Sequence, residues 1–536
     1  MAGSSSFPYL FLQQLTVPSA LVLCFLSSFA GVALYRCFLS PLARSKIPGP
    51  RLAALTSWYE CYYDVVQQAQ YAFKIKEMHA DYGPIIRIGP NDVSISDPDF
   101  TDTVYVPGPG HKRDKDHAKN KALGVDSSVG GSITHDLHRR RREALNLFFS
   151  SRRIHQGLES ELKARSEQME SVFANAKETK TVVNLSDLYY AFANDIVHKY
   201  CFGNSPNLLS DLDLAHTRRT NVAAVLGSVK VMLHFGWIRD LMELLPLSVR
   251  WGMMPPGVRD MMTFRAEIRQ QIDRLLAAAT GLAVKNGAAP SIFTHLRDNG
   301  SLPESEKTAQ RLEDEAVLMT MAGSYSPMLS LATAHYYLVS RPDIMRKLRA
   351  ELADNKSSVQ STAQQLEQLP YLSGIIHEAH RLTFGLTGRN PRVCPDETLV
   401  YTDTTSTNTP KTYTIPPGTS ISVSTLLIHT NKTLFPDPWK FDPSRWMLTP
   451  SSTEDEKEAV RRRQKALLAF NRGPRGCIGA HLANAEMAVA VAAMARWDME
   501  LFETSEEEDV RFRHDYHVMC PGLGSKGVRV QVLGRH

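Results

Sequence analysis

The sequence predicts a mainly α-helical protein with small β-sheets, preceded by one N-terminal transmembrane helix. An uncharged, largely apolar run covers residues 15–35. Residues 183–285 and 308–337 carry long helical patterns, and two alternating runs around a Gly-Pro-Asn-Asp turn within residues 84–95 predict a β-hairpin. The chain has 536 residues, enough for one large domain or about two to three ordinary ones. Its mild net charge of +5 gives no indication of nucleic-acid binding.

Residues 15–35 predict a single membrane anchor, because 21 uncharged residues suffice to cross one bilayer. The α-amino group is the only basic group that precedes this run, and four basic residues follow it: Arg36, Arg44, Lys46 and Arg51. The positive-inside rule then predicts a short lumenal N-terminus at residues 1–14 and a cytosolic main domain. A cleaved signal peptide is the competing interpretation, but its positive charge would precede the apolar run. Two prolines on either side of Gly49 predict a stiff hinge at residues 36–52, before the main domain at residues 53–536.

One cysteine, Cys477, lies among glycines, a proline and two arginines, just before an Ala-rich helical run at residues 481–494. Glycines let the backbone pass close to a flat ligand. A helix N-terminus and nearby amides favour an ionised sulfur. A thiolate in this position suits axial ligation of haem iron, whereas a buried structural cysteine is the alternative interpretation. The seven cysteines include no Cys-x-x-Cys pair, which argues against a zinc cluster or a disulfide scaffold.

The spacing Phe-x-x-Gly-x-Arg-x-Cys-x-Gly resembles the haem-binding loop of cytochromes P450 at each fixed position: Phe470, Gly473, Arg475, Cys477 and Gly479. The resemblance covers the whole chain and is to the fungal microsomal type, with residues 59–97 and 382–395 similar to the trichodiene oxygenase group. It implies the cytochrome P450 fold, with residues 53–536 as a haem-thiolate catalytic domain. It also implies haem b (iron protoporphyrin IX), with the Cys477 thiolate as the axial metal ligand.

The longest helical candidate contains the run Ala322-Gly323-Ser324-Tyr325-Ser326-Pro327. The resemblance implies that this helix crosses the distal haem face and that Ala322 and Gly323 leave room for dioxygen; a small-residue contact between helices is the alternative. It places Ser326 and Tyr325 at the positions of the alcohol and the acid that relay protons. A tyrosine is a poor replacement for a carboxylic acid, since its pKa is near ~10. Pro327 lacks an N–H, which predicts a kink in the helix.

Four residues resemble the family's contacts to the haem propionates. His138 and Arg142 are four apart on a predicted helix and therefore share a face, with His138 in place of the family's tryptophan. Arg392 and Arg475 occupy positions of propionate-binding arginines, and arginine suits bidentate contact with a carboxylate. A solvated surface is the alternative for His138 and its basic neighbours.

Three charged residues resemble the family's structural network behind the haem. Glu378 and Arg381 match its Glu-x-x-Arg motif, and their spacing places both on one helix face. Arg445 lies in a segment that resembles the one supplying the third member. Because Glu-x-x-Arg occurs by chance in many helices, the assignment depends on the order of the motifs. The implied role is structural rather than chemical.

Two surface segments carry further expectations. Residues 244–257 contain a tryptophan and two methionines, and the resemblance implies a loop that caps the substrate pocket and dips into the membrane; packing in the core is the alternative. Residues 461–465 are basic and either attract an acidic flavoprotein reductase or form an ordinary charged surface.

The resemblance implies a monooxygenase that hydroxylates or epoxidises a small apolar substrate, a terpenoid or another secondary metabolite. Dioxygen is the oxidant, and NADPH-cytochrome P450 reductase supplies the electrons. The implied location is the endoplasmic reticulum membrane, with a single span, a cytosolic catalytic domain and no nucleic-acid partner. Tyr325 and Pro327 leave open a haem-thiolate isomerase, dehydratase or peroxide-using enzyme. A haem-dependent binding protein is the non-enzymatic alternative.

Overall fold

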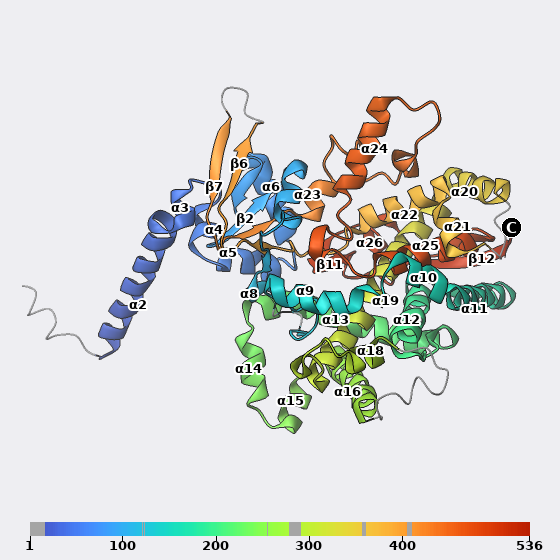
Figure 1. Cartoon of the computed structure of the whole chain (residues 1–536), viewed down its shortest axis with the longest axis horizontal. Helices are drawn as coiled ribbons and strands as arrows, with labels where there is room; N and C mark the ends of the chain where they lie inside the picture. Colours follow the sequence, from blue (N-terminus) through green and yellow to red (C-terminus); the bar gives the residue numbers. More distant parts are fainter. Residues whose placement is uncertain are drawn as a thin grey trace, which may run out of the picture.

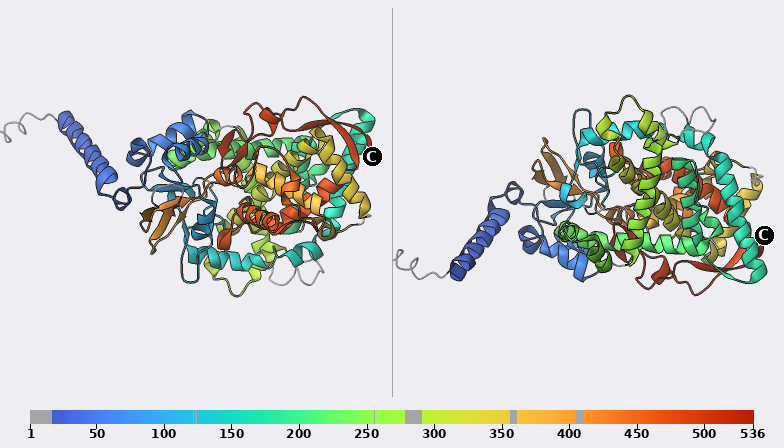
Figure 2. Two further views of the ribbon diagram at one scale, coloured as in Figure 1. Left: turned by 90° about the horizontal axis from the view of Figure 1, so that it is seen from above. Right: turned by 90° about the horizontal axis from the view of Figure 1, so that it is seen from below.

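The computed structural model describes residues 17–277 except 121, 123 and 255, together with residues 291–355, 361–404 and 410–536. It confirms the predicted fold class, because helices dominate and the β-sheets are small (Figure 1). Figure 2 shows from two further sides that helix α2 (Val17–Leu34) stands away from the body of the protein. The predicted lumenal residues 1–14 lie outside the described residues.

Helix α2 has the length and composition of a membrane-spanning helix. Together with the π-helical turn η1 (Tyr35–Leu39) it contains a 19-residue candidate span, Leu21–Leu39, which has a mean hydropathy of 1.8 and is not buried against the protein. This span ends four residues after the predicted anchor and includes Arg36. The Arg36 guanidinium donates to the Leu55 carbonyl at 2.9 Å, so this cation is held at the protein end of the span.

Five short strands form a sheet next to α2, in the order β1-β2-β8-β5-β3. Their bounds are β1 (Ile85–Arg87), β2 (Asp92–Ile95), β8 (Ser420–Ser422), β5 (Arg392–Val393) and β3 (Asp114–Lys115). Strands β1 and β2 pair antiparallel with Ile85 opposite Ile95, which confirms the predicted hairpin. Lys115 lies opposite Arg392 across the β3–β5 pair. A second hairpin, β6 (Leu399–Asp403) with β7 (Lys411–Ile415), projects beside this sheet (Figure 1).

The helical body is built around α19 (Ala309–Ser340), a helix of 32 residues. Three helices pack around it: α12 (Leu185–Phe202), α22 (Pro370–Thr383) and α25 (Ala480–Met494). Helix α13 (Leu212–His234) and helix α16 (Pro256–Ala277) lie against each other and against α19. Alanines buried along α25 keep its surface narrow, so it can approach α19 and α22 closely. The buried apolar side chains of these helices form one core, which extends from α11 (Glu159–Thr179) to α19.

The remaining elements complete the fold. The helices are α3 (Pro41–Arg44), α4 (Arg51–Leu55), α5 (Trp58–Cys61), α6 (Tyr71–Tyr82), α7 (Thr101–Tyr105), α8 (His117–Asn120), α9 (His135–Asn146), α10 (Ser151–Gly157), α11 (Glu159–Thr179), α14 (Trp237–Glu243), α15 (Leu247–Met253), α18 (Ile292–Asp298), α20 (Pro342–Asp354), α21 (Ala363–Glu367), α23 (Thr425–His429), α24 (Glu454–Ala466) and α26 (Glu506–Asp509). The turns are the π-helical η2 (Tyr62–Val66) and the 3₁₀-helical η3 (Pro98–Phe100), η5 (Leu208–Ser210), η6 (Glu304–Glu306), η7 (Pro443–Trp446) and η8 (Gly473–Arg475). The other sheets pair β4 (Val182–Asn184), β12 (Arg529–Arg535) and β9 (Trp497–Leu501), and β10 (His514–Tyr516) with β11 (Val518–Cys520).

Candidate active site

A cavity of about 310 Å³ lies between α19 and the start of α25. Most residues singled out by the sequence motifs line it: Cys477, Phe470, Arg475, Arg142, Arg392, His138, Ala322, Gly323 and Ser326. They come from α9, β5, α19 and the loop before α25. Segments that are hundreds of residues apart in the chain therefore converge on one space, which we call the haem cavity.

The backbone before α25 holds Cys477 in a tight turn. Gly473 in η8 has φ +72°, and a Cβ at this position would overlap the carbonyl oxygen of Tyr105. Glycine is therefore required here by both conformation and space. The Cys477 amide donates to the Phe470 carbonyl at 2.7 Å, and Gly479 is the N-cap of α25. The Cys477 side chain is exposed to the cavity, as an iron ligand needs to be.

The surroundings of Cys477 include groups that raise the pKa of its thiol and groups that lower it. Burial raises the pKa of the thiol, while the Gly479 amide and the Arg142 guanidinium lower it. The amide acts as the sequence predicts, but burial is the larger effect. Burial of the thiol thus opposes the effect of the helix N-terminus, and a metal cation, when bound, favours the thiolate.

Three arginines, Arg392 buried and Arg142 and Arg475 partly buried, surround the haem cavity without an acidic partner. Arg475 donates to backbone carbonyls only, those of Arg113, Ser132 and Ile133. Arg142 donates to the Gly476 carbonyl, and Arg392 donates to Asn390 and Pro391. No carboxylate of the described residues forms an ion pair with any of the three. Burial lowers the pKa of Arg475 to about 9 and lowers the pKa values of Arg142 and Arg392.

This donor set fits haem. Buried cations are costly unless an anion accompanies them, and the two propionates of haem would supply such anions. His138 is buried at the same cavity, and burial together with Arg475 lowers its pKa to about 3, so it is a neutral hydrogen-bonding group there. The Cys477 thiol, which lies across the cavity from an apolar face of α19, is the remaining member of this set of ligands. The residues that would hold the group are therefore Cys477, the three arginines and His138.

Small residues on α19 make room at the distal side of the haem cavity. A Cβ added to Gly323 would lie 2.8 Å from Val197 Cγ2 of α12, so glycine is needed for close packing of the two helices. The Ser326 hydroxyl lines the cavity and has no hydrogen-bond partner among the described residues. Helix α19 continues without a break through Pro327. Because Pro327 has no N–H, the Gly323 carbonyl four residues earlier lacks its helical donor.

We expect Gly323→Ala to destabilise the protein by about 1–3 kcal/mol, because the new methyl group would press against Val197. The free energy of unfolding of the haem-loaded protein measures this change. Val197→Ala in the same chain should restore part of the loss, since it removes the overlapping methyl groups. Equal stabilities of Gly323→Ala and wild type would contradict the packing argument.

Tyr325 does not line the haem cavity. It lines a second cavity of about 240 Å³, where burial raises its pKa to about 12. The two cavities share a boundary, since Ala322 and Ser326 line both. The second cavity is apolar on the side of α13, with Val222, Leu226 and Val229 in its wall. It thus adjoins the haem cavity and has an apolar wall on the side of α13.

A buried charge network lies behind the haem cavity. Arg381 Nε and Nη2 donate to the two oxygens of Glu378 at 2.8 and 2.7 Å, and both side chains are 0% exposed. Arg445 Nε lies 3.3 Å from Glu378, and Trp446 Nε1 donates to it at 3.0 Å. The structure thus brings together Glu378, Arg381 and Arg445, as the sequence predicts. Trp446 is a fourth member that the motifs do not reveal.

Three titratable residues at the haem cavity have no counterpart in the sequence motifs. Glu315 accepts from the Val129 amide at 2.9 Å and pairs with Arg311. Glu486 is fully buried without a hydrogen-bond partner among the described residues, and burial raises its pKa well above the usual value. Lys115 is the third. Its place in the Lys-rich stretch at residues 112–121 was the only sequence signal.

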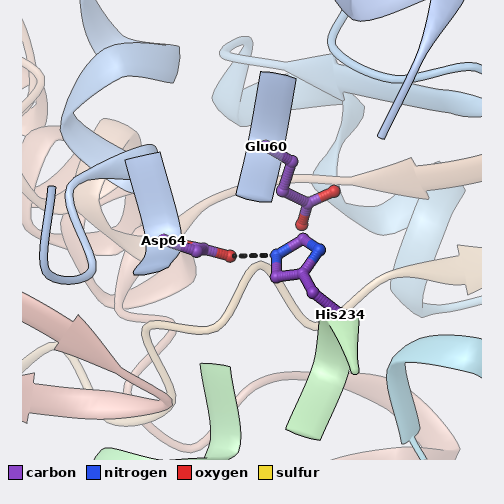
Figure 3. A group of neighbouring side chains, drawn as sticks. All are labelled: Glu60, Asp64 and His234. Atoms are coloured by element: carbon purple, nitrogen blue, oxygen red, sulfur yellow. Dashed lines mark hydrogen bonds and ion pairs between the residues drawn. The ribbon is translucent and has the colours of Figure 1, made fainter. Parts of the chain in front are cut away.

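A polar cluster lies beyond the second cavity, where Glu60, Asp64 and His234 approach one another (Figure 3). His234 Nε2 is 3.3 Å from Asp64, and Lys230 of α13 pairs with both Asp64 and Asp515 at 3.1 Å. Glu60 pairs with Arg389 and with Lys119. Cations of the protein already satisfy these carboxylates, so the cluster is an ion-pair network rather than a metal site. It fastens the end of α13 to η2 and β10.

Comparisons with known proteins agree with this site. The sequence profile of the family described as cytochrome P450 matches residues 52–522. The chain is 33% identical to the cytochrome P450 monooxygenase tpcC of Cochliobolus heterostrophus over 97% of both chains. It is 34% identical to conidiogenone synthase PchP450 of Penicillium rubens (95% and 97% covered) and 33% identical to tryptophan 6-hydroxylase fscE of Fusarium equiseti (97% of both). The chain therefore belongs to the cytochrome P450 family, whose members bind haem through a cysteine thiolate, and it is an enzyme of the monooxygenase type.

Proposed function

We propose that this enzyme inserts one oxygen atom of dioxygen into a small apolar secondary metabolite, with electrons from NADPH through NADPH-cytochrome P450 reductase. The observation that carries the proposal is Cys477 facing a cavity that three unpaired arginines surround. In this proposal Cys477 is the iron ligand, with Phe470 packed beside it. Arg142, Arg392, Arg475 and His138 bind the propionates. When bound, haem supplies the oxygen-activating chemistry, and the apolar second cavity holds the substrate.

The experiment is turnover of the haem-loaded protein with NADPH, a fungal reductase and ¹⁸O-labelled dioxygen. A library of apolar terpenoids, first screened for a shift of the haem absorption band, supplies candidate substrates. The proposal expects one labelled oxygen atom in the product. Product formation without dioxygen would instead assign an isomerase, a dehydratase or a peroxide-using enzyme. Absence of NADPH consumption with every ligand that shifts the band would favour a binding protein.

We propose Ser326, rather than Tyr325, as the residue that moves protons at the distal side. The Ser326 hydroxyl lines the haem cavity, whereas Tyr325 lines the second cavity and has a pKa near 12. We expect Ser326→Ala to increase the fraction of NADPH consumed as released hydrogen peroxide by about tenfold or more, because a positioned proton donor typically contributes at least that much. Tyr325→Phe should leave this fraction unchanged. The opposite ranking of the two variants in a peroxide assay would show that the assignment is wrong.

The basic face that receives the reductase lies, we propose, on α9 rather than at residues 461–465. The latter are already paired: Arg461 with Glu458, Arg462 with Asp99 and Lys465 with Asp102. Arg139 and Arg140 of α9 are exposed and form no ion pair with any described residue. Helix α9 is tied to the Cys477 loop, because its residue Arg142 donates to the Gly476 carbonyl. An acidic partner on α9 would thus lie next to the cysteine loop.

We expect Arg139→Glu/Arg140→Glu to raise the reductase concentration for half-maximal turnover by about tenfold at low salt, and by less at high salt, because these charges attract the partner through water. The matched control is Arg461→Glu/Arg462→Glu, which should have a smaller effect. Steady-state rates at several ionic strengths measure both. A larger increase of this reductase concentration in the control would mean that the reductase binds at residues 461–465 instead.

We propose an endoplasmic reticulum location with a cytosolic catalytic domain. The exposed apolar helix α2 supports a single span, and apolar side chains on α14 and α15 support a second membrane contact. Trp237, Leu244 and Met253 are 60, 82 and 62% exposed, respectively, so this segment is not packed in the core. Aromatic and aliphatic side chains on short helices are suited to the lipid headgroup region. An apolar substrate would then reach the enzyme from the membrane.

A further inference from the structure

Lys115 is a cation whose position the proposed roles leave unexplained. It lies on β3 directly opposite Arg392 of β5, and like charges on opposite positions destabilise a pair of strands. Burial, together with Arg392 and Arg475, lowers the pKa of Lys115 to about 7. Such an arrangement of cations indicates that an anion binds between or beside them.

No carboxylate of the described residues forms an ion pair with Lys115. Its Nζ donates to Asn120 Oδ1 at 3.1 Å and to the Gly130 carbonyl. An ammonium group has three N–H donors, so one donor remains for a ligand. The other lysines that line the second cavity differ in this respect: Lys119 pairs with Asp92 and Glu60, and Lys230 pairs with Asp64 and Asp515.

Haem does not balance all the cations at this cavity. Haem would supply two propionates for three guanidinium groups that lack an acidic partner, those of Arg142, Arg392 and Arg475. Lys115 adds a further positive charge at the same cavity. A third carboxylate, supplied by a molecule other than haem, would reduce this excess.

Lys115 lies where the haem cavity and the second cavity join, because it lines both. Asn390 also lines both; its Oδ1 accepts from Arg392 Nη1 at 3.0 Å, and its Nδ2 has no acceptor among the described residues. The third N–H of Lys115 and the Nδ2 group of Asn390 are therefore hydrogen-bond donors available where the two cavities join. The wall of the second cavity is apolar, with Leu226 and Leu233 of α13 in it. An apolar ligand with one acidic end matches this distribution.

We propose that Lys115 binds a carboxylate of the substrate, and that the substrate is an apolar molecule with one carboxylic acid group. The inference rests on the proposed monooxygenase function and narrows its substrate class. A haem propionate has the same chemistry as a substrate carboxylate. The experiment therefore has to separate these two sources.

The experiment titrates the haem-loaded full chain with decanoic acid and with methyl decanoate, which share one apolar body and differ in charge. Calorimetry and the shift of the haem absorption band each give a dissociation constant. The proposal expects the acid to bind about tenfold more tightly than the ester in the wild type, as a charge-assisted hydrogen bond would provide. Lys115→Met should remove this preference with an unchanged haem content. Lys119→Met is the matched control and should keep the preference, because Lys119 already has acidic partners.

Equal affinities for the acid and the ester in the wild type would overturn the proposal, and so would a preference that survives in Lys115→Met. If Lys115→Met folds, as judged by circular dichroism, but loses haem, the carboxylate belongs to a propionate and the substrate assignment is wrong. Failure of the wild type to show the absorption band of a haem-thiolate protein would contradict the proposed function itself. The two failures are therefore distinguishable.

Discussion

Cys477→Ala is expected to abolish the red-shifted absorption band of the reduced, carbon monoxide-treated protein and all product formation with NADPH. The band depends on a thiolate bonded to the iron, and alanine supplies no ligand. Among the described cysteines, Cys477 alone lines the haem cavity. The measurement is the difference spectrum of purified protein, with total haem determined separately. Loss of the band with haem still bound would identify the lost group as the ligand.

The matched control for this experiment is Cys520→Ala. Cys520 is partly exposed on β11 and lines neither of the two cavities. This variant should keep the full band. If Cys477→Ala kept the band, or if Cys520→Ala lost it, the assignment of the iron ligand would be wrong.

Arg381→Met is expected to destabilise the protein by about 3–5 kcal/mol, which is a large part of the stability of a typical protein. The substitution leaves the Glu378 carboxylate buried without the two bonds at 2.7 and 2.8 Å that Arg381 provides. Arg445 and Trp446 still contact Glu378, but they contribute one contact each. Chemical denaturation of the haem-loaded protein, followed by circular dichroism, measures the change. Failure to recover folded protein at all agrees with the same prediction.

Arg461→Met is the control for this substitution. Arg461 pairs with Glu458 at the same three-residue spacing on α24, but the two side chains are 59 and 57% exposed. Water screens such a pair, so the expected change is within about 0.5 kcal/mol. A similar loss of stability in both variants would mean that burial does not determine how much the Glu378–Arg381 pair contributes to the free energy of unfolding.

The haem-loop and distal-helix motifs predicted the residues that line the haem cavity, because each motif couples residue type to spacing along one segment. Once the fold places such a segment, the positions of its motif residues in space are also fixed. The same reasoning placed Tyr325 beside Ser326, but neighbours in a helix point about 100° apart: Ser326 lines both cavities, whereas Tyr325 lines only the second. Sequence spacing alone did not show which of the two points to the haem cavity.

Residues that act through contacts across the chain were not predictable in this way. Trp446 joins Glu378 from a turn 68 positions later, and Lys115 meets Arg392 only because β3 pairs with β5. The basic run at residues 461–465 looked available for a partner in sequence, but its acidic partners Asp99 and Asp102 come from the distant elements η3 and α7. Pairing of strands and of charges between distant segments is decided by packing, which no local pattern encodes.

The division of the interior into two adjoining cavities has an evolutionary consequence. The haem cavity is lined by residues of α9, β5, α19 and the loop before α25, whereas α13 contributes to the wall of the second cavity alone. In the proposed function the second cavity holds the substrate, so substitutions confined to α13 are expected to change which molecule is accepted and to leave the lining of the haem cavity unaltered. After a gene duplication, drift confined to α13 would then alter the ligand preference of one copy before it altered the residues that would hold haem.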